Sequence, residues 1–569
     1  MTRLARTSID RLQSFAVATA LSLLSATTAA CQSRAASPPD TTTRAVDRVF
    51  DAWRSTDGPG CAVGVSRNNR VVYERGYGMA NLETGTPITP ASIFHVASVS
   101  KQFTAAAIML LVRDGKLALD DDIRKYLPEI PDYGTRITIR HLLNHTSGLR
   151  DQWALLGLAR GRFEENRITE ADVMDVVPRQ RALNFTPGAE YLYSNTGYTL
   201  AAVIVKRVSG KSLREFADER IFKPLGMSST HFHDDYTMLV PGRTSAYAPR
   251  GSGWRVSIPN YDTYGATSLF TTVGDLLKWE ANFENPVVGD RDLLAQMQIS
   301  GRLTSGDSTG YGLGLSVGRY RGARLVEHGG ADAGYRTVAS RFPEDGLAVV
   351  VLCNAASADP TALARGVSDI YLTGRLTPRD TQVALQGVSV APEALARRAG
   401  VYVQPTTLQI IELTFREGKL FVGRQGNLAL TPLAENRFRI GGQPFEVVFA
   451  DGPERRFERR TLGGGPTLVF EGKPAVVAVP GAFTPYAGHY YSEEVQSTYR
   501  VTATDSLITL RTGTSDALDA RPVFADTFLG GGYTIQFLRK GREIVGFEIT
   551  NGRMRRVRFD RVTQQRVAR

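Results

Sequence analysis

The sequence predicts an α+β fold, in which an antiparallel sheet flanked by helices is followed by two small antiparallel β-barrels. Three observations lead to this prediction. Within residues 43–373, strand-like segments stand at both ends and helix-like segments stand between them. Beyond residue 392 helical periodicity gives way to short alternating strands with Gly, Asn and Asp turns. This second region divides into two blocks of similar pattern, 393–480 and 481–569.

The chain has 569 residues, which is too long for one ordinary hydrophobic core and favours three or four structural units. With 42% hydrophobic and 22% charged residues, its composition is that of a globular protein. The net charge of +11 comes mostly from arginines, which are densest at 454–460 and 553–561. Because the second run alternates with apolar residues, we expect its arginines on solvent-exposed strand faces; an anionic envelope polymer or lipid surface as partner is the alternative. Nothing resembles a nucleic-acid-binding module, so no nucleic-acid partner is expected.

Residues 1–30 have the pattern of a bacterial export signal. Three arginines precede the apolar run 15–26, which is too short to span a membrane. Cys31 follows two alanines, as at a lipoprotein cleavage site, although Thr28 stands where leucine is usual. We therefore expect an exported protein, either free in the periplasm or anchored to a membrane through a lipidated Cys31. Residues 31–42 read as a polar tether.

Two further cysteines would face an oxidising compartment after export. Cys61 opens the strand-like segment CAVGVS, and Cys353 closes the strand-like segment LAVVVLC. Antiparallel pairing of these strands would bring the two sulfur atoms close enough for a disulfide. Two buried free thiols are the alternative.

Four segments define the first region. The stretches 61–78 and 338–355 each predict a β-hairpin. The stretches 100–115 and 195–210 each predict an apolar helix that ends at a glycine. Strands at the ends and helices between them favour one antiparallel sheet covered by helices.

The two blocks after the predicted linker, 374–392, repeat each other weakly. The segment 395–403 (LARRAGVYV) opens the first block as 484–492 (TPYAGHYYS) opens the second. Later in the blocks, 437–452 corresponds to 526–541. Two β-barrels in tandem explain this pattern best.

One serine stands in a familiar hydrolase pattern. Residues 306–310 read GDSTG, which fits the G-x-S-x-G motif of many esterases and lipases. That motif needs a buried strand before the serine and a helix after it. Here the upstream flank is polar and the downstream flank is Gly-rich and strand-like. We predict that Ser308 lies in a polar surface loop and is not a nucleophile.

Three other short motifs carry residues suited to acyl transfer: SVSK at 98–101, YSN at 193–195 and HGG at 328–330. In SVSK the serine and lysine stand three residues apart at a helix start, so both side chains lie on one face. The serine amide then lies at the positive end of the helix. Each motif alone is weak, because S-x-x-K is expected about once by chance in a chain of this length. The candidate residues are Ser98, Lys101, Tyr193, Asn195, His328, Gly329 and Gly330.

In this order and spacing the motifs resemble those of the serine β-lactamase and penicillin-recognising family, in its class C β-lactamase, D-aminopeptidase and esterase branch. That branch carries S-x-x-K, then Y-x-N, then K-T-G or H-x-G. Further stretches match its pattern: RHLLNHTSGL (140–149), ERIFKPLGM (219–227), GATSLFTTVGDLLKW (265–279) and YGLGL (311–315). The resemblance covers about residues 55–373. It implies that 43–373 is a β-lactamase/transpeptidase-like catalytic domain with a helical subdomain, and similar D-aminopeptidases also carry two C-terminal β-barrels.

The resemblance implies a nucleophile and a base. Ser98 would attack a carbonyl carbon and form an acyl-enzyme. Lys101 or Tyr193 would take its proton, and Lys101 can do so only if its pKa falls from about 10.4 to near neutrality. Asn195 would hold Lys101 and the substrate amide. The sequence does not apportion the proton between lysine and tyrosine.

The resemblance also implies an oxyanion site. The backbone amides of Ser98 and Ala331 would hold the developing negative charge. Gly329 and Gly330 would let substrate approach the strand edge without a Cβ clash.

His328 departs from the lysine form of the third motif. A lysine there can hold the free carboxylate of a penicillin or a D-Ala-D-Ala terminus. Histidine, with a pKa of about 6.5, is mostly neutral at about pH 7 and holds a carboxylate less well. This difference favours substrates without that anchor, such as amides, peptides or esters of N-terminal D-residues.

We expect a serine hydrolase that needs no cofactor and acts through an acyl-enzyme, as a D-amino-acid peptidase or amidase on small molecules, short peptides or peptidoglycan fragments. A small-ester hydrolase is the alternative within the same chemistry. A penicillin-reactive, peptidoglycan-binding protein with little turnover is the alternative from another class.

Two histidine pairs have spacings that zinc sites use, namely His141 with His145 and His231 with His233. A zinc site needs a third ligand and usually a carboxylate partner, and no H-E-x-x-H motif is present, so no metal is expected.

Overall fold

The computed structural model describes residues 40–161, 165–378, 388–426, 428–441, 443, 445–452, 454–461, 467–476, 479–513 and 517–563. The predicted export signal, nearly all of the predicted tether and residues 379–387 of the predicted linker lie outside this range. Among the helices described, none is long and apolar enough to cross a membrane.

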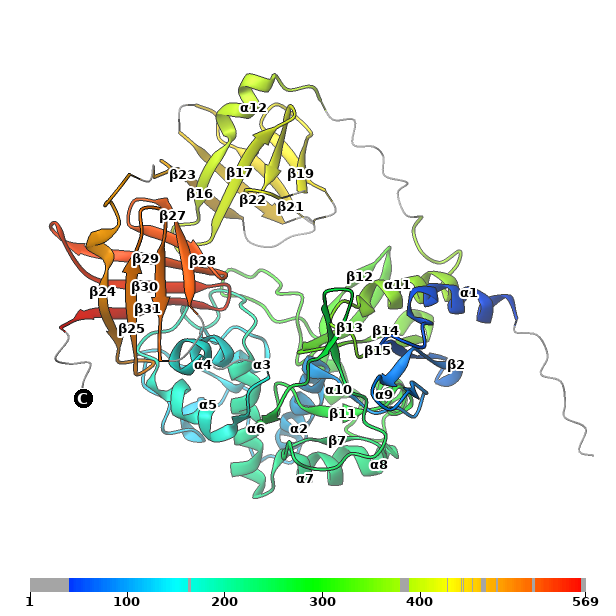
Figure 1. The fold of residues 1–569 in the computed structure, drawn as a ribbon. Helices are drawn as coiled ribbons and strands as arrows, with labels where there is room; N and C mark the ends of the chain where they lie inside the picture. The colour runs from blue at the N-terminus through cyan, green and yellow to red at the C-terminus, as the bar shows by residue number, and fades with distance from the viewer. Residues whose placement is uncertain are drawn as a thin grey trace, which may run out of the picture.

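A six-stranded antiparallel sheet forms the centre of the first region (Figure 1). Its spatial order is β12-β13-β14-β15-β1-β2. The strands are β1 (Cys61–Arg67), β2 (Arg70–Tyr77), β12 (Ser316–Tyr320), β13 (Ala323–Asp332), β14 (Tyr335–Phe342) and β15 (Leu347–Cys353). Since strands from both ends of the region pair with each other, the predicted single antiparallel sheet and both predicted hairpins are confirmed.

The two central cysteines meet in this sheet. Cys61 lies directly opposite Cys353 in the β1–β15 pairing. Both are completely buried and form a disulfide between residues 292 positions apart. The predicted disulfide is therefore present, and the alternative of two free thiols is wrong.

Helices cover both faces of the sheet. The described helices are α1 (Thr41–Val49), α2 (Lys101–Arg113), α3 (Ile139–Leu143), α4 (Gln152–Arg160), α5 (Glu170–Val176), α6 (Asn195–Ser209), α7 (Leu213–Ala217), α8 (Lys223–Leu225), α9 (Val273–Asn282), α10 (Arg291–Met297), α11 (Pro360–Tyr371) and α12 (Pro392–Arg398). Because side chains alternate along a strand, Val63 and Val65 of β1 face α1 and α11. Gly64 faces the opposite side, where a Cβ would lie 3.1 Å from Leu277 of α9.

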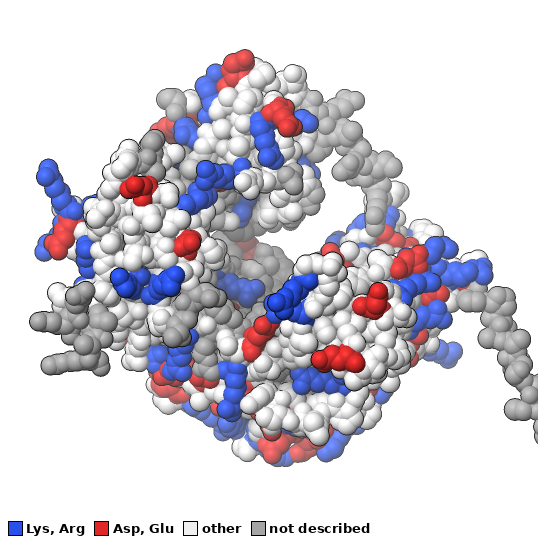
Figure 2. All heavy atoms as spheres, viewed as in Figure 1, with Lys and Arg blue, Asp and Glu red and all other residues white. Residues whose placement is uncertain are grey.

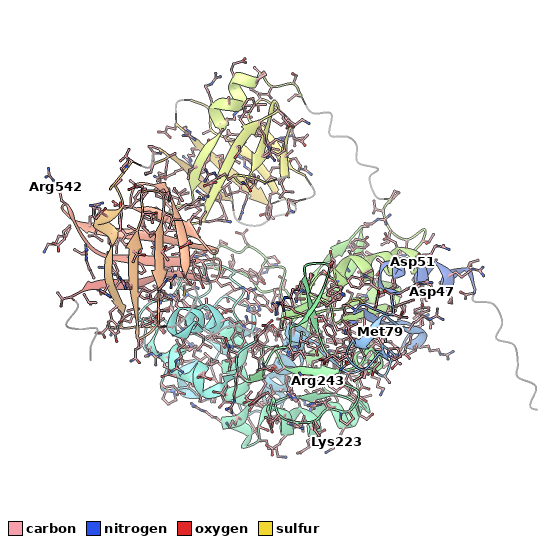
Figure 3. All side chains as sticks on the ribbon, viewed as in Figure 1. Asp47, Asp51, Met79, Lys223, Arg243 and Arg542 are labelled. Carbon is pink, nitrogen blue, oxygen red and sulfur yellow. A yellow bond between two sulfur atoms is a disulfide. The ribbon has the colours of Figure 1, made fainter. Side chains whose placement is uncertain are left out.

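The N-terminal helix α1 is fixed to the sheet by one carboxylate. Asp47, labelled in Figure 3, accepts hydrogen bonds from the hydroxyl groups of Tyr73 at 2.5 Å and Tyr77 at 2.7 Å. Arg75 donates to the same carboxylate at 2.7 Å. The four side chains join the helix to β2.

The helices α2 and α6 confirm the two predicted apolar helices. Eleven of the 13 residues of α2 and eleven of the 15 residues of α6 are buried, and the two helices pack against each other in the main hydrophobic core. Gly210 ends α6 with φ +73°, a left-handed conformation that glycine adopts without strain. The remaining short strands of this region are β3 (Met79–Asn81), β4 (Thr86–Pro87), β5 (Phe94–His95), β6 (Ile168–Thr169), β7 (His231–Phe232), β8 (Tyr247–Arg250), β9 (Gly253–Val256), β10 (Tyr261–Asp262) and β11 (Leu269–Thr271).

Two closed eight-stranded antiparallel barrels follow (Figure 1). The first consists of β16 (Gly400–Val403), β17 (Ile410–Arg416), β18 (Lys419–Val422), β19 (Leu428–Pro432), β20 (Arg437–Ile440), β21 (Phe445–Phe449), β22 (Arg456–Thr461) and β23 (Leu468–Lys473). The second consists of β24 (Gly488–Ser492), β25 (Ser497–Ala503), β26 (Ile508–Arg511), β27 (Leu518–Phe524), β28 (Thr527–Gly530), β29 (Tyr533–Lys540), β30 (Glu543–Asn551) and β31 (Met554–Val562). The repeated segments fall on equivalent strands, β16 with β24 and β20–β21 with β28–β29, which confirms the predicted repeat.

The second barrel packs on the helical part of the first region (Figure 1). The Tyr499 hydroxyl of β25 donates to the carbonyl of Leu158 in α4 at 3.0 Å. Arg150 and Glu494 form an ion pair in which both side chains are buried. Apolar residues of the second barrel belong to the same core as α2 and α6.

The arginine run 553–561 does not lie wholly in solvent, so the prediction for it is partly wrong. The Arg555 side chain is only 10% exposed and pairs with Glu190 at 2.9 Å. The end of the β30–β31 hairpin is covered by the helical part of the first region, which the alternating pattern alone could not show. Arg558, farther along β31, pairs with Asp560 near the surface.

Candidate active site

Ser98 lies on a 3-10 turn, Ala97–Ser100, that leads directly into α2. In a 3-10 turn, side chains three residues apart are eclipsed, and Ser98 Oγ lies 3.0 Å from Lys101 Nζ. Ala97 has φ +48°, a left-handed conformation that is unfavourable for a residue with a Cβ and that often marks functional sites. Ser98 is partly exposed, whereas its neighbours Ala97 and Val99 are buried. The turn therefore presents one hydroxyl to the surface.

The turn is held from two sides. The Ser100 hydroxyl donates to the Ala97 carbonyl at 2.5 Å and accepts from the Leu269 amide of β11 at 3.0 Å. Thr337 of β14 donates to the Val96 carbonyl at 2.9 Å. These bonds connect the turn to the sheet.

Lys101 is completely buried, and its Nζ has three partners. It lies 3.0 Å from Ser98 Oγ, 2.8 Å from Asn195 Oδ1 and 2.6 Å from the Ala266 carbonyl. A neutral amine can donate to the two carbonyl oxygens and direct its lone pair at the serine hydroxyl. The geometry is thus that of a base next to a nucleophile.

The electrostatic surroundings make this role available at neutral pH. Burial lowers the pKa of Lys101 to about 7. The negative charges of Asp332 and Asp151 oppose this shift, whereas the positive charge of Arg553 adds to it. A substantial fraction of Lys101 is therefore neutral at pH 7.

Tyr193 lies on the other side of the nucleophile. Burial raises the pKa of Tyr193 far above its usual range, although a hydrogen bond with Ser98 acts in the opposite direction. The centre of its ring lies 4.9 Å from Lys101 Nζ and 4.2 Å from the centre of the His145 ring, which is tilted by 35°. A phenol that stays protonated beside Ser98 can donate a proton to a leaving group.

Asp151 fixes the orientation of Asn195. The backbone N–H and the side-chain Nδ2 of Asn195 donate to Asp151 Oδ2 at 2.7 and 2.9 Å. This leaves Asn195 Oδ1 directed at Lys101. Asp151 is almost completely buried and caps α4 through the Trp153 amide.

His328 is neutral and has both ring nitrogens engaged. Its Nδ1 donates to the Gly329 carbonyl at 2.6 Å, so Nε2 accepts from the Tyr311 hydroxyl at 2.8 Å. Burial lowers the pKa of His328 to about 3, and the charge of Lys101 adds to this effect. His328 therefore offers no positive charge to a substrate carboxylate, as the sequence predicted.

The end of β13 is open on one side. On one edge, Val326–Asp332 pairs with β14, but β12 reaches only as far as Glu327 on the other edge. From His328 to Ala331 that second edge has no strand partner among the described residues. Gly329 and Ala331 are exposed there, which suits the predicted contact with substrate.

The two glycines of this strand serve different purposes. A Cβ on Gly329 would meet only the Thr337 carbonyl at 3.6 Å. A Cβ on Gly330 would lie 2.3 Å from the Val96 carbonyl in the chain leading to the nucleophile turn. Gly330 is therefore needed for the packing of β13 against that turn, and the prediction that it serves substrate access does not explain its position.

The structure thus brings Ser98, Lys101, Tyr193 and Asn195 into one contact group, with the unpaired edge of β13 beside it. Sequence reasoning missed four residues of this site. They are His145, Asp151, Tyr311 and Arg553. His145 and Tyr311 lie in stretches that matched the family pattern, but nothing in the sequence indicated their contacts.

Two other sequence features lie outside the site. Ser308 is exposed, and its hydroxyl lies 2.7 Å from that of Ser300, which is not a base. The predicted surface loop is confirmed. His231 and His233 lie 3.3 Å apart, nitrogen to nitrogen, and no group of three or more potential metal ligands occurs within the described part of the chain.

The chain is similar to known proteins in sequence and in fold. The model of the family described as Beta-lactamase matches residues 45–371, so the chain belongs to the beta-lactamase family. A D-aminopeptidase of Gluconobacter oxydans (strain 621H) is 30% identical over 308 residues, which are 54% of this chain and 58% of that protein. A D-aminopeptidase of Brucella anthropi is 30% identical over 297 residues, 52% of this chain and 56% of that protein. The chain therefore spans a little over half the length of the curated relatives it matches.

Solved structures share the fold. A penicillin-binding protein homologue from Pyrococcus abyssi, described as octameric, aligns with a TM-score of 0.54 and 22% identity over 76% of this chain and 100% of that chain. A D-amino acid amidase from Ochrobactrum anthropi SV3, in complex with L-phenylalanine amide, aligns with a TM-score of 0.50 and 23% identity over 58% of this chain and 97% of that chain.

Proposed function

We propose that the protein is a serine hydrolase that opens amide or ester bonds through an acyl-enzyme on Ser98, and that it acts as a D-amino-acid peptidase or amidase on small molecules or short peptides. One observation carries the reaction type: the buried Lys101 amine lies 3.0 Å from Ser98 Oγ and has a pKa of about 7. Membership of the beta-lactamase family and the similarity to D-aminopeptidases support the substrate class.

We infer the following proton transfers from these positions. Ser98 Oγ attacks the carbonyl carbon while its proton passes to Lys101 Nζ. Tyr193, which stays protonated, donates to the departing nitrogen or oxygen and is reprotonated from Lys101. Water then attacks the acyl-enzyme while Lys101 takes a proton from it, and Lys101 returns that proton to Ser98 Oγ as the acid product leaves.

The backbone amides of Ser98 and Ala331 would stabilise the oxyanion. Ser98 N lies in the turn before α2, and Ala331 lies on the unpaired edge of β13. Loss of one such donor typically costs about 3 to 4 kcal/mol of transition-state stabilisation.

A turnover panel tests the proposal. D-alanine p-nitroanilide, its N-acetyl form and matched p-nitrophenyl esters are assayed with the wild-type protein, Ser98→Ala and Ser308→Ala. We expect hydrolysis by the wild-type protein and Ser308→Ala, and none by Ser98→Ala. Esters cleaved without amides would favour the small-ester alternative. Acylation by penicillin with no turnover of any substrate would favour the penicillin-reactive, peptidoglycan-binding alternative.

We also propose that the protein is exported and acts in the periplasm, with lipidation of Cys31 as its membrane anchor. The Cys61–Cys353 disulfide supports an oxidising compartment. Cell fractionation of the wild-type protein and Cys31→Ser tests this proposal. Release of Cys31→Ser from the membrane fraction is expected, and a wild-type protein that is never in that fraction would contradict the anchor.

A further inference from the structure

The turn between β30 and β31 of the second barrel reaches the candidate active site. The Arg553 carbonyl in this turn accepts from the Asp151 amide at 3.3 Å and from Asn184 Nδ2 at 3.2 Å. Asn184 Oδ1 in turn accepts from the Arg555 amide at 2.9 Å. The Arg555–Glu190 ion pair holds the same turn. The backbone at Arg553 is therefore fixed beside Asp151, independently of its side chain.

The Arg553 side chain lies next to Tyr193 and Asp151. Its guanidinium lies 5.0 Å from the centre of the Tyr193 ring and 4.0 Å from Asp151 Oδ2. The side chain is 49% exposed, so its charge is accessible from solvent. Figure 2 shows a hollow between the barrels and the first region, with Lys and Arg side chains on its walls.

Among the described residues, the Arg553 guanidinium has one ion-pair partner, Asp151, at 4.0 Å. Asp151 already accepts hydrogen bonds from the amide and Nδ2 of Asn195 and from the Trp153 amide. Within the described residues, the Arg553 guanidinium donates no hydrogen bond. A planar group with five N–H donors in a fixed fork is suited to a carboxylate.

The other positive groups of the site cannot take this role. Lys101 is completely buried, and its Nζ is engaged with three oxygens. His328 and His145 are held neutral by burial, which lowers the pKa of both. Arg553 is thus an accessible, permanent positive charge next to the reacting groups, supplied by a residue 455 positions away from Ser98 in the sequence.

We propose that Arg553 binds a carboxylate of the substrate close to the scissile bond, so that the preferred amides and esters carry such a carboxylate and those with a free α-ammonium group are disfavoured. This inference rests on the proposed serine hydrolase function and narrows its substrate class. The carboxylate belongs either to the acyl part or to the leaving part of the substrate. Both positions place an anion near Tyr193.

Matched substrates distinguish these two positions. N-succinyl-D-alanine p-nitroanilide carries a carboxylate on the acyl part, N-acetyl-D-alanine p-nitroanilide is neutral, and D-alanine p-nitroanilide carries an ammonium group. N-acetyl-D-alanyl-D-alanine and its C-terminal amide differ only by a carboxylate on the leaving part. We expect one of the two carboxylate substrates to exceed its neutral partner in kcat/KM by about 10- to 100-fold, the range of a charged hydrogen-bonded pair.

Variants assign the preference to Arg553. In Arg553→Ala, the kcat/KM values for the charged and neutral substrates should become equal, mainly through a change in KM. Arg553→Lys should retain part of the preference for the charged substrate. Arg553→Glu should reverse it in favour of D-alanine p-nitroanilide. Arg558→Ala, in the same strand but paired with Asp560 near the surface, should leave the ratio unchanged. Melting temperatures verify that each variant is folded.

An unchanged ratio in Arg553→Ala, or a wild-type preference for the ammonium substrate, would overturn the inference while leaving the serine hydrolase intact. If the wild-type protein hydrolyses none of the substrates, the proposed function fails instead. In that case calorimetric binding of N-succinyl-D-alanine amide and N-acetyl-D-alanyl-D-alanine to Ser98→Ala, with and without Arg553→Ala, still tests Arg553. Equal binding by both proteins, or no binding, would reject it.

Discussion

Replacing Arg553 should raise the pH at which the proposed hydrolysis begins. Burial sets most of the lowered pKa of Lys101, and the positive charge of Arg553 adds to it. Lys101 Nζ and the guanidinium lie 4.9 and 5.0 Å from the centre of the same Tyr193 ring, so the two charges are no more than about 10 Å apart. At an effective dielectric constant of about 20, this repulsion amounts to about 1.7 kcal/mol. Because the Arg553 side chain is 49% exposed, solvent and salt reduce it by about half.

The remaining repulsion of about 0.8 kcal/mol corresponds to a shift of about 0.6 in the pKa of Lys101. Only the neutral form of Lys101 accepts the Ser98 proton, so activity falls as pH drops through the pKa of Lys101. Removal of Arg553 raises this pKa, and the acidic limb of the pH profile then moves to higher pH. If Lys101 titrates near pH 7, its neutral fraction at that pH falls from about one half to about one fifth.

The assay is kcat/KM for neutral N-acetyl-D-alanine p-nitroanilide from about pH 5 to 9.5, with wild type, Arg553→Ala, Arg553→Lys and Arg558→Ala. We compare the pH at which the acidic limb lies rather than the absolute rate, so a change in substrate binding does not affect the comparison. Arg553→Lys keeps the charge and should keep the limb. A limb that stays in place or moves to lower pH in Arg553→Ala would refute the electrostatic argument.

Three further variants test other parts of the structure. Asp151→Ala leaves two Asn195 donors without their acceptor and should lower kcat by about 10- to 100-fold in steady-state kinetics. An unchanged kcat would contradict the role of Asp151 in orienting Asn195. Gly330→Ala places a Cβ 2.3 Å from the Val96 carbonyl and should lower the free energy of unfolding in urea by about 1 to 3 kcal/mol. Gly329→Ala, whose nearest contact would lie at 3.6 Å, should leave the stability unchanged. Equal stabilities of the two variants would refute the packing role of Gly330. The Cys61→Ser, Cys353→Ser double variant removes a cross-link that spans 292 residues and should lose about 2 to 5 kcal/mol of stability in the same measurement. Reduction of the wild-type disulfide should lower its free energy of unfolding by the same amount.

Much of the fold could be predicted because its signals are local. The hairpin at Cys61–Tyr77 and the helices α2 and α6 follow from alternation, apolar runs and terminal glycines. Ser98, Lys101, Tyr193 and Asn195 could be named because short motifs carry them. The 3-10 turn that contains Ser98 could not be predicted, because the spacing of Ser98 and Lys101 is equally compatible with an α-helix.

What could not be predicted depends on contacts between distant segments. Asp151 supports Asn195 across 44 residues, and no motif marks it. Arg553 belongs to a run that alternates like a solvated strand, and only the docking of the second barrel turns it toward Tyr193. The lowered pKa of Lys101 likewise results from burial in the assembled core rather than from its sequence neighbours.

The proposed reaction passes through a covalent intermediate on Ser98. Mass spectrometry of the intact protein, quenched in acid during turnover of a p-nitrophenyl ester, followed by peptide mapping, tests it most directly. We expect one acyl group per chain on the peptide that contains Ser98, present in Ser308→Ala and absent in Ser98→Ala. Acylation that survives Ser98→Ala, or that maps to another residue in the wild-type protein, would contradict it.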